Sequence, residues 1–281
     1  MTAQGISFGA ASVVNAVPTG IGSAFGLQLS VTAEVKLLDE PIIEYEVKVR
    51  GAKSNVDDRL IKALVQVLKE EYHQTSGIKV AIDSNIPFGR GLKSSSVVAN
   101  ALSLAVDQEM NLHFSKLEAV KFGVKIAKKA GVTLTGAFDD ACASMFGGVQ
   151  VTDNSATKII KSYDVEDKAI VILNPKYPRP KEGGSKETYQ SLTNLMSVPI
   201  TLALQMRWKE ALLLNGLLVS SVLKLDVNPV CDALNAGAEV AGLSGFGPAI
   251  VAVTDNPQNV IEAWKHYSDD IITSRTRRLE E

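Results

Sequence analysis

A glycine- and serine-rich turn between a strand-like and a helix-like segment limits the possible folds of this chain more than any other feature. Ile78 to Asp83 alternates apolar and polar residues, as a half-buried strand does. Ser95 to about Met110 places its apolar residues along one helical stripe. The turn between them reads Pro87-Phe88-Gly89-Arg90-Gly91-Leu92-Lys93-Ser94-Ser95-Ser96. The order is therefore strand, glycine-rich turn, helix, with the amino end of a helix at the turn.

This turn has the composition of an anion site. Gly89 and Gly91 allow close approach of the backbone to a ligand, and the first N–H groups of the following helix have no partner within the helix. The helix dipole favours a phosphate there, Lys93 adds a positive charge, and the three serines add hydroxyl groups. A plain strand-to-helix turn that needs glycine and a serine cap is the alternative. The spacing matches neither G-x-x-x-x-G-K-[ST] nor G-x-G-x-x-G, which disfavours the two folds that carry those motifs.

Bulk properties exclude several classes of protein. A chain of 281 residues is long enough for two lobes with a cleft, and its 46% hydrophobic content is that of a globular protein. The formal net charge of −2 provides no general attraction to nucleic acid or to an anionic membrane, and no stretch reaches the roughly 18 apolar residues of a membrane span. Cys142 and Cys231 lie far apart, which favours a reducing compartment, and we expect a cytoplasmic protein.

Secondary structure around the turn follows from periodicity and caps. Val31–Leu38 and Ile42–Arg50 are predicted strands, and the short charged connection between them predicts a hairpin. A helix is expected from Asp57 or Asp58 to about His73. Ser115 and Glu118 form the sequence pattern of a capping box at the start of another helix, which ends near Gly131.

The second half of the chain alternates between strands and helices. A loop rich in proline and glycine, Asn174–Ser185, has the composition of a surface loop over a cleft, and we place the domain division shortly before it. Helical patterns dominate from about Lys186 to Leu225. The remaining predictions are strands at 149–152, 157–161, 169–173, 249–253 and 271–277 and helices at 230–238 and 258–267.

Three segments together resemble the motifs of the GHMP kinases, the superfamily of galactokinase, homoserine kinase and mevalonate kinase. Pro87-x-Gly89-x-Gly91-Leu92-x-Ser94-Ser95 is similar to the second motif of that family, which wraps the triphosphate of ATP. Gly242–Ala249 resembles the third motif, and Ser12–Gly20 occupies the place of the first in altered form. The resemblance implies an α+β fold of two lobes, with an N-terminal lobe like domain 2 of ribosomal protein S5 and a ferredoxin-like C-terminal lobe. We expect these domains at residues 1–165, which contain the ATP-binding loop, and 166–281.

Within this superfamily, the segments Asn15–Gly26, Gly91–Ser96 and Thr135–Ala141 resemble the archaeal shikimate kinases. That resemblance implies transfer of the γ-phosphate of ATP to the 3-hydroxyl of shikimate, in the synthesis of aromatic amino acids. A GHMP kinase for another small alcohol, such as homoserine, is the alternative. A nucleotide-binding regulator or an RNA-binding module is the alternative outside the enzymes, and the near-neutral charge and the 6% aromatic content count against RNA.

The resemblance also assigns roles to individual residues. Asp140, seven residues before Gly147, matches the register of a catalytic aspartate and is the predicted base, with Asp139 as its neighbour in the catalytic pair. A solvated pair of aspartates at a turn is the alternative. The stretch from Ala119 to Phe138 contains no acidic residue where related kinases place a magnesium-binding glutamate, so Mg2+ is expected at Ser95 and Asp139, or at Ser95 and Asp140 with waters. The predicted ATP-binding residues are Pro87, Phe88, Gly89, Arg90, Gly91, Leu92, Lys93, Ser94, Ser95, Ser96, Ser244, Gly245 and Gly247.

The acceptor side is the least defined part of the predicted site. By family analogy, Asn15, Thr19 and Gly20 are expected to line the acceptor pocket. The carboxylate of shikimate calls for an arginine, because a guanidinium binds a carboxylate through two parallel hydrogen bonds. The candidates are Arg90 in the phosphate turn, Arg179 in the proline-rich loop and Arg207 at the start of a helix, and Arg179 is the predicted partner.

Overall fold

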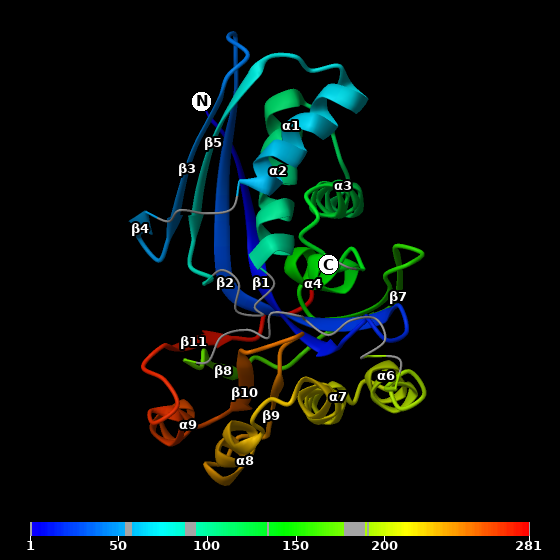
Figure 1. Ribbon diagram of the computed structural model, residues 1–281, viewed down its shortest axis with the longest axis vertical. Coiled ribbons are helices and arrows are strands. Elements are labelled where there is room, and N and C mark those ends of the chain that lie inside the picture. The colour runs from blue at the N-terminus through cyan, green and yellow to red at the C-terminus, as the bar shows by residue number, and fades with distance from the viewer. Residues whose placement is uncertain are drawn as a thin grey trace.

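Two lobes, each built on one β-sheet, lie end to end in the computed structural model (Figure 1). The structure describes residues 2–53, 58–87, 94–133, 135–176, 189 and 191–280. Both sheets are packed against helices, so the two-lobed α+β fold expected from the sequence is confirmed. Within the described residues, none of the helices combines the length and the apolarity that crossing a bilayer requires.

The N-terminal sheet has the strand order β4-β3-β5-β2-β6-β7, and β1 pairs with β2 off this path. Its strands are β1 (Ala3–Val14), β2 (Ile21–Leu38), β3 (Ile43–Val49), β4 (Ala52–Lys53), β5 (Gly77–Ser84), β6 (Val149–Asp153) and β7 (Lys158–Tyr163). The helices of this lobe are α1 (Arg59–Tyr72), α2 (Ser94–Met110), α3 (Lys116–Lys129) and α4 (Phe138–Phe146). They cover one face of the sheet, with α2 nearest to the strands and α4 closest to the second lobe (Figure 1).

The predicted hairpin between the strands on either side of Asp39-Glu40-Pro41 is wrong. Both strands exist, but β5 lies between them, antiparallel to β2 and parallel to β3. The backbone N–H groups of Gly77 and Ile78 donate to the carbonyl oxygens of Glu40 and Ile42, which starts the insertion. The alternation of apolar residues identifies a strand but not its partner, and here α1 connects β3 to a parallel β5 as a crossover.

The helix boundaries were predicted more closely than the strand pairing. Helix α1 begins after Asp58, which stands at its N-cap position without a side-chain capping bond. Helix α3 has both hydrogen bonds of the capping box, between Ser115 and Glu118, as expected. Helix α4 was not predicted, because its nine residues contain no capping pattern at their start, where Ala137 has a left-handed φ of 47°.

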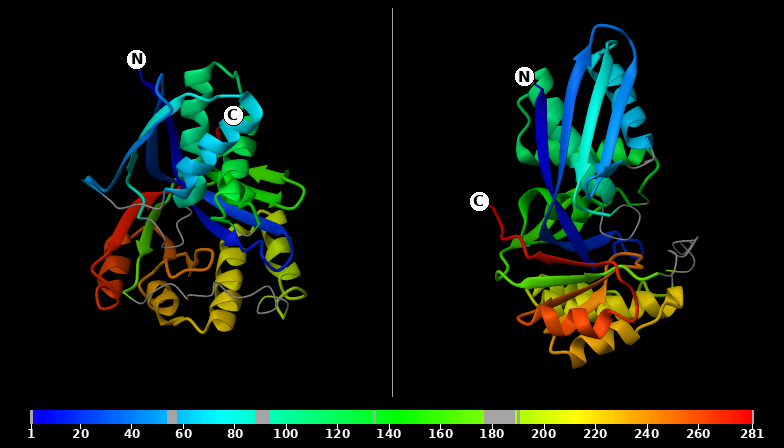
Figure 2. Two further views of the ribbon diagram at one scale, coloured as in Figure 1. Left: turned by 45° about the horizontal axis from the view of Figure 1, so that its top comes forward. Right: turned by 90° about the vertical axis from the view of Figure 1, so that its left-hand side faces the viewer.

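The C-terminal lobe has an antiparallel sheet of order β11-β8-β10-β9. Its elements are β8 (Ala169–Leu173), α6 (Ser197–Leu204), α7 (Trp208–Leu223), α8 (Asn228–Asn235), β9 (Val240–Leu243), β10 (Ile250–Thr254), α9 (Pro257–Trp264) and β11 (Ile271–Arg275). The helices lie on the side of this sheet that faces away from the N-terminal lobe (Figure 2). The chain leaves the first sheet after Tyr163 and enters the second at Ala169, and the division of domains at 165/166 remains a prediction.

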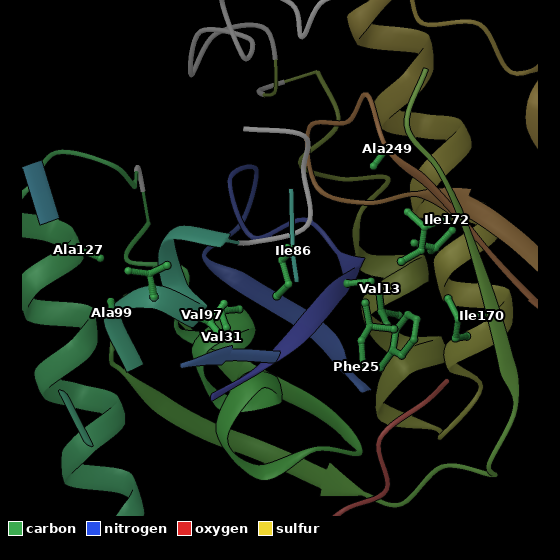
Figure 3. Close-up of a cluster of buried hydrophobic side chains, with 14 of the residues drawn as sticks. Val13, Phe25, Val31, Ile86, Val97, Ala99, Ala127, Ile170, Ile172 and Ala249 are labelled. Atoms are coloured by element: carbon green, nitrogen blue, oxygen red, sulfur yellow. The ribbon is translucent and has the colours of Figure 1, made fainter. Parts of the chain in front are cut away.

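One hydrophobic core runs through both lobes. Val13 and Phe25, from the lower ends of β1 and β2, lie beside Ile170 and Ile172 of β8 (Figure 3). The ring of Phe25 also packs against that of Trp208, with 4.8 Å between centroids and an angle of 41° between the ring planes. The first two strands therefore belong to the N-terminal sheet at one end and to the interface between the lobes at the other, which is where the candidate site residues gather.

Candidate functional site

Helix α4 carries Asp139 and Asp140 in its first turn, and both side chains are buried. Asp139 is 3% exposed and Asp140 is 1% exposed, so the alternative of a solvated pair at a turn is wrong. The amino end of a helix carries partial positive charge, which stabilises carboxylates placed there. The burial of two adjacent carboxylates without that support would be strongly unfavourable.

Asn154 holds Asp139 in place. The Nδ2 of Asn154 donates to Oδ1 of Asp139 over 2.8 Å, and its own Oδ1 accepts the backbone N–H of Asp139 over 3.1 Å. The hydroxyl of Thr152 donates to the same amide oxygen, which sets the orientation of the amide. Among the described residues, no lysine or arginine forms an ion pair with Asp139. Its Oδ2 faces Gly22 of β2, where a Cβ would lie only 2.5 Å away.

Ser12 of β1 connects Asp140 to the third motif. The hydroxyl of Ser12 donates to Oδ1 of Asp140 over a long 3.4 Å. The backbone N–H of the same serine donates to the hydroxyl oxygen of Ser244 over 3.2 Å. Asp140 and Ser244 are 104 positions apart in the chain, and this one strand residue brings them to the same place in the interface between the lobes.

Asn15 forms a second link between the lobes. Its backbone N–H donates to Oδ1 of Asn215 in α7 over 2.9 Å, and its Nδ2 donates to the carbonyl oxygen of Gly245 over 3.4 Å. Asn215 is fully buried, and its Nδ2 has no hydrogen-bond partner among the residues that the structure describes. Gly245 and Gly247 both have positive φ, 63° and 67°, and the turn they form closes through the N–H of Gly247 on the carbonyl of Ser244.

The segment after Asn15 folds back beside Asp139. Gly20 has a φ of 83°, and its carbonyl oxygen accepts the backbone N–H of Asn154 over 2.9 Å. The hydroxyl of Thr19 accepts the N–H of Ile21 over 3.1 Å, which closes a tight local turn. Asn154 therefore bonds to Asp139 on one side and to Gly20 on the other, and the structure brings these predicted site residues together.

Only part of the predicted phosphate turn is described. Pro87 is half-buried at one end, and Ser94, Ser95 and Ser96 form the first turn of α2 at the other. Ser94 and Ser96 are buried, whereas Ser95 is partly exposed. In the next turn Nδ2 of Asn100 donates to the carbonyl oxygen of Ala141 over 2.9 Å, which ties the start of α2 to α4. The predicted residues Phe88, Gly89, Arg90, Gly91, Leu92, Lys93 and Arg179 lie outside the described residues.

Arg207 and Cys142 are two further residues whose relation to this cluster matters for function. Arg207 is exposed at the start of α7, and its side chain pairs with Glu210 over 3.0 Å rather than with a residue of this cluster. Burial raises the pKa of the Cys142 thiol well above its usual value, and the charges of Asp139 and Asp140 raise it further. The thiol beside the two aspartates is therefore protonated at neutral pH, which excludes it as a thiolate nucleophile.

Asn154 and Asn215 are the site residues that sequence reasoning missed. Asn154 follows a strand in the turn Asp153-Asn154-Ser155 and has the appearance of an ordinary turn residue. Asn215 could have been found, because it is a polar residue within the otherwise apolar stretch of α7 and such residues are usually bonded to something specific. Within the described residues no group of three or more histidine, cysteine, aspartate or glutamate side chains is arranged to hold a metal ion.

Comparisons with a protein-family model and with known protein sequences point to the same group of proteins. A family model described as the GHMP kinases N terminal domain matches residues 59–148. A shikimate kinase of Thermococcus kodakarensis is 44% identical over 264 residues, which are 94% of this chain and 96% of that protein. A shikimate kinase of Pyrococcus furiosus is 41% identical over 98% of this chain and 99% of that protein.

Solved structures share the fold at much lower identity. A mevalonate kinase of L. major, determined in complex with R-mevalonate, has a TM-score of 0.72 with 17% identity and covers 99% of this chain and 97% of its own. A galactokinase of Lactococcus lactis, complexed with galactose, has a TM-score of 0.74 with 13% identity and covers 99% of this chain and 94% of its own. These similarities concern the fold alone.

Proposed function

We propose that this chain, which belongs to the GHMP kinases and among them to the family of the archaeal shikimate kinases, transfers the γ-phosphoryl group of ATP to the 3-hydroxyl of shikimate. The single observation that carries the proposal is the extent of the similarity, since 39 to 44% of the residues are identical to relatives named shikimate kinase over almost the full length of both chains. The reducing compartment suggested by two free cysteines makes the cytoplasm its expected location.

The reaction needs a group that receives or orients the acceptor hydroxyl, and we assign this role to Asp140. It stands at the amino end of α4 and meets Ser12 and, through Ser12, the Ser244 turn of the other lobe. A carboxylate there accepts the hydroxyl proton as phosphoryl transfer proceeds, or orients the oxygen in line with the γ-phosphate. Phosphoryl transfer depends mainly on positioning and charge neutralisation, so a buried and well-held carboxylate meets its main requirement.

ATP is assigned to the amino end of α2 and the turn before it. Ser94, Ser95 and Ser96 occupy the first helical turn, where unpaired backbone N–H groups and the helix dipole favour phosphate oxygens. The Ser244–Gly247 turn lies against β1, where Ser12 bonds to Ser244 and Asn15 bonds both to Gly245 and to Asn215 of α7. Asn15, Thr19 and Gly20 are assigned to the acceptor side, because Gly20 is tied to Asp139 through Asn154.

The residues present fit a Mg2+ ion bound mainly through the nucleotide. Mg2+ in kinase sites keeps several waters and takes one or two protein oxygens together with phosphate oxygens, so no cage of protein ligands is needed. Asp139 is a buried carboxylate without an ion pair among the described residues, and Ser95 presents a partly exposed hydroxyl. Ser95 with Asp139 or Asp140 would hold the ion, which neutralises the charge that develops on the transferred phosphoryl group.

A coupled assay for ADP formation tests the proposal. The purified chain is incubated with ATP, Mg2+ and shikimate, and in parallel with homoserine, mevalonate or galactose in place of shikimate. We expect turnover with shikimate and none above background with the other alcohols. If homoserine is phosphorylated and shikimate is not, the chain is still a GHMP kinase, but shikimate is the wrong acceptor.

The substitution Asp140→Asn tests the assigned chemistry. It keeps the size of the side chain and removes its ability to take up a proton, so we expect kcat to fall by a factor of about 100 to 10,000. Binding of an ATP analogue should not change, since ATP is assigned to α2. Wild-type kcat in Asp140→Asn would exclude this residue as the base and leave Asp139 as the candidate.

A further inference from the structure

The carboxyl end of α4 is capped by the last residues of the chain. The last four carbonyl groups of an α-helix have no partner within the helix and must find one elsewhere when they are buried. In α4 the carbonyl of Ala143 accepts the N–H of Gly147 over 3.0 Å, as in an ordinary helix end. The other three carbonyl groups accept hydrogen bonds from the C-terminal tail. They are those of Ser144, Met145 and Phe146.

Arg277 supplies two of these bonds. Its Nη1 donates to the carbonyl oxygen of Ser144 over 3.0 Å, and its Nη2 donates to that of Met145 over 3.2 Å. The backbone N–H of Glu280 then donates to the carbonyl of Phe146 over 2.8 Å. The guanidinium is held from the other side as well, by the carboxylate of Glu280 and by the ring of Phe8, whose centroid lies 4.1 Å from Cζ.

This arginine is buried, unlike its neighbours. Arg277 is 8% exposed, whereas the side chains of Arg275 and Arg278 are 47% and 69% exposed and pair with Asp167 and Asp164 at the surface. Burial of a guanidinium is costly unless its donors are bonded, and here the carbonyl groups of a helix end provide the bonds. The position therefore requires an arginine and not merely a positive charge.

The tail reaches α4 because it leaves the C-terminal lobe and crosses to the N-terminal lobe. After β11 the backbone N–H of Arg277 donates to the carbonyl of Gly26 in β2, and its carbonyl accepts the N–H of Gly148. Figure 1 places the C-terminus beside α4, and Figure 2 shows the last segment running out of the lower sheet toward the upper lobe. The backbone of Arg277 is thus hydrogen-bonded to Gly26 and to Gly148, and its side chain reaches α4 from that fixed position.

We propose that Arg277 is a positioning residue for the phosphoryl transfer, which acts by fixing α4 so that Asp139 and Asp140 stand in their working places. This inference rests on the proposed function. Asp140 lies four residues before Ser144, about 6 Å along the helix axis, so a shift of the carboxyl end moves the aspartates as one body. A helix of nine residues has little stability by itself, and its position depends on the contacts at its two ends.

Electrostatics support the same assignment. The helix dipole places partial negative charge at the carboxyl end, where Arg277 lies, and partial positive charge at the amino end, where the two carboxylates lie. Each charge is on the end that stabilises it. Removing Arg277 would leave two buried carbonyl groups without donors, which favours fraying of the last turn.

The experiment compares Arg277→Ala with Arg275→Ala, which changes the last residue of β11, an arginine whose exposed side chain pairs with Asp167 at the surface. For Arg277→Ala we expect kcat to fall between about tenfold and a hundredfold with little change in KM for ATP, the effect of a misplaced catalytic group. Millimolar guanidinium chloride should restore part of that kcat by filling the vacated site. Arg275→Ala should retain wild-type kcat and show no response to guanidinium.

Two further measurements keep the inference falsifiable. Arg277→Lys preserves the charge but cannot hold both carbonyls in the same geometry, so it should retain only part of the activity. If it shows wild-type kcat, or if Arg277→Ala loses activity that guanidinium does not restore, the positioning role is wrong.

Amide hydrogen exchange separates this inference from the proposed function, because it needs no turnover. In Arg277→Ala, exchange should rise in residues 138–146 and stay unchanged in α3 and β5. A wild-type chain inactive on shikimate, with this pattern of exchange, would overturn the proposed function and keep the capping role. Unchanged exchange in α4 would overturn the inference whatever the substrate.

Discussion

The contact between Gly22 and Asp139 allows a quantitative prediction for Gly22→Ala. A Cβ at this position would lie 2.5 Å from Oδ2 and 2.7 Å from Cγ of Asp139. A carbon and an oxygen atom in ordinary contact are about 3.3 Å apart or more, so one partner must move by roughly 0.8 Å. The methyl carbon of Ala16 would lie 2.9 Å from the same Cβ, so the added atom is crowded by Ala16 as well, although the carboxylate is closer. The carboxylate of Asp139 is therefore the group that moves.

A displacement of this size should be visible mainly in the rate. Misplacing a catalytic group by about 1 Å costs up to roughly a hundredfold in rate, and we expect kcat with shikimate to fall between about tenfold and a hundredfold. Overpacking should lower the free energy of unfolding by about 1 to 3 kcal/mol, which leaves the chain folded at 25 °C. The assay is steady-state ADP release, with thermal unfolding followed in parallel.

Gly9→Ala is the matched control for this experiment. The atoms nearest to its Cβ would be side-chain carbons of Leu27, Leu29 and Ile86, at 3.3 to 3.4 Å, and neither aspartate is among them. It should cost some stability and leave kcat within about twofold of wild type. A folded Gly22→Ala protein with wild-type kcat would refute the reasoning, because Asp139 would then tolerate displacement and have no positional role in the reaction.

Three further predictions concern other parts of the molecule. Asn154→Asp replaces the donor to Asp139 by a second negative charge at the position of an atom 2.8 Å from its Oδ1, which should lower kcat at pH 7 at least tenfold, because two carboxylates at that distance repel each other and displace Asp139; a wild-type kcat would contradict this. Titration with Ellman's reagent at pH 8 should detect one thiol in the native protein, the exposed Cys231, and two in urea, since Cys142 is buried with a raised pKa. The hydrogen bond from Arg278 lowers the pKa of Asp164 to about 2, so this pair stabilises the fold above the ordinary aspartate pKa and loses that effect as the pH falls toward 2. Arg278→Ala should accordingly lower Tm slightly at pH 7 and by less at pH 2, and an equal difference at both pH values would exclude the ion pair as its cause.

The sequence alone was sufficient for the elements with strong local signals. The capping box at Ser115 and Glu118 uses only residues three positions apart, so it could be predicted without knowledge of the fold. The start of α2 directly after a glycine-rich turn was predictable for the same reason. Recognition of the family resemblance added the two-lobed fold and the pair Asp139 and Asp140, with Asp140 as the predicted base.

The partners of these residues were decided by the tertiary structure. Strand β5 is inserted between β2 and β3, and the bonds of Asn215 and Ser12 join residues that are far apart in the chain. Both aspartates are buried by surfaces that come from separate segments of the chain. Arg277 of the C-terminal tail bonds to Ser144, a residue 133 positions before it in the chain. Periodicity and capping report only on neighbours along the chain, whereas the position of a carboxylate depends on every surface packed around it. For this protein the sequence determined which groups are available for phosphoryl transfer, and the packing of α4 against β1, β2 and the C-terminal tail decided where they stand.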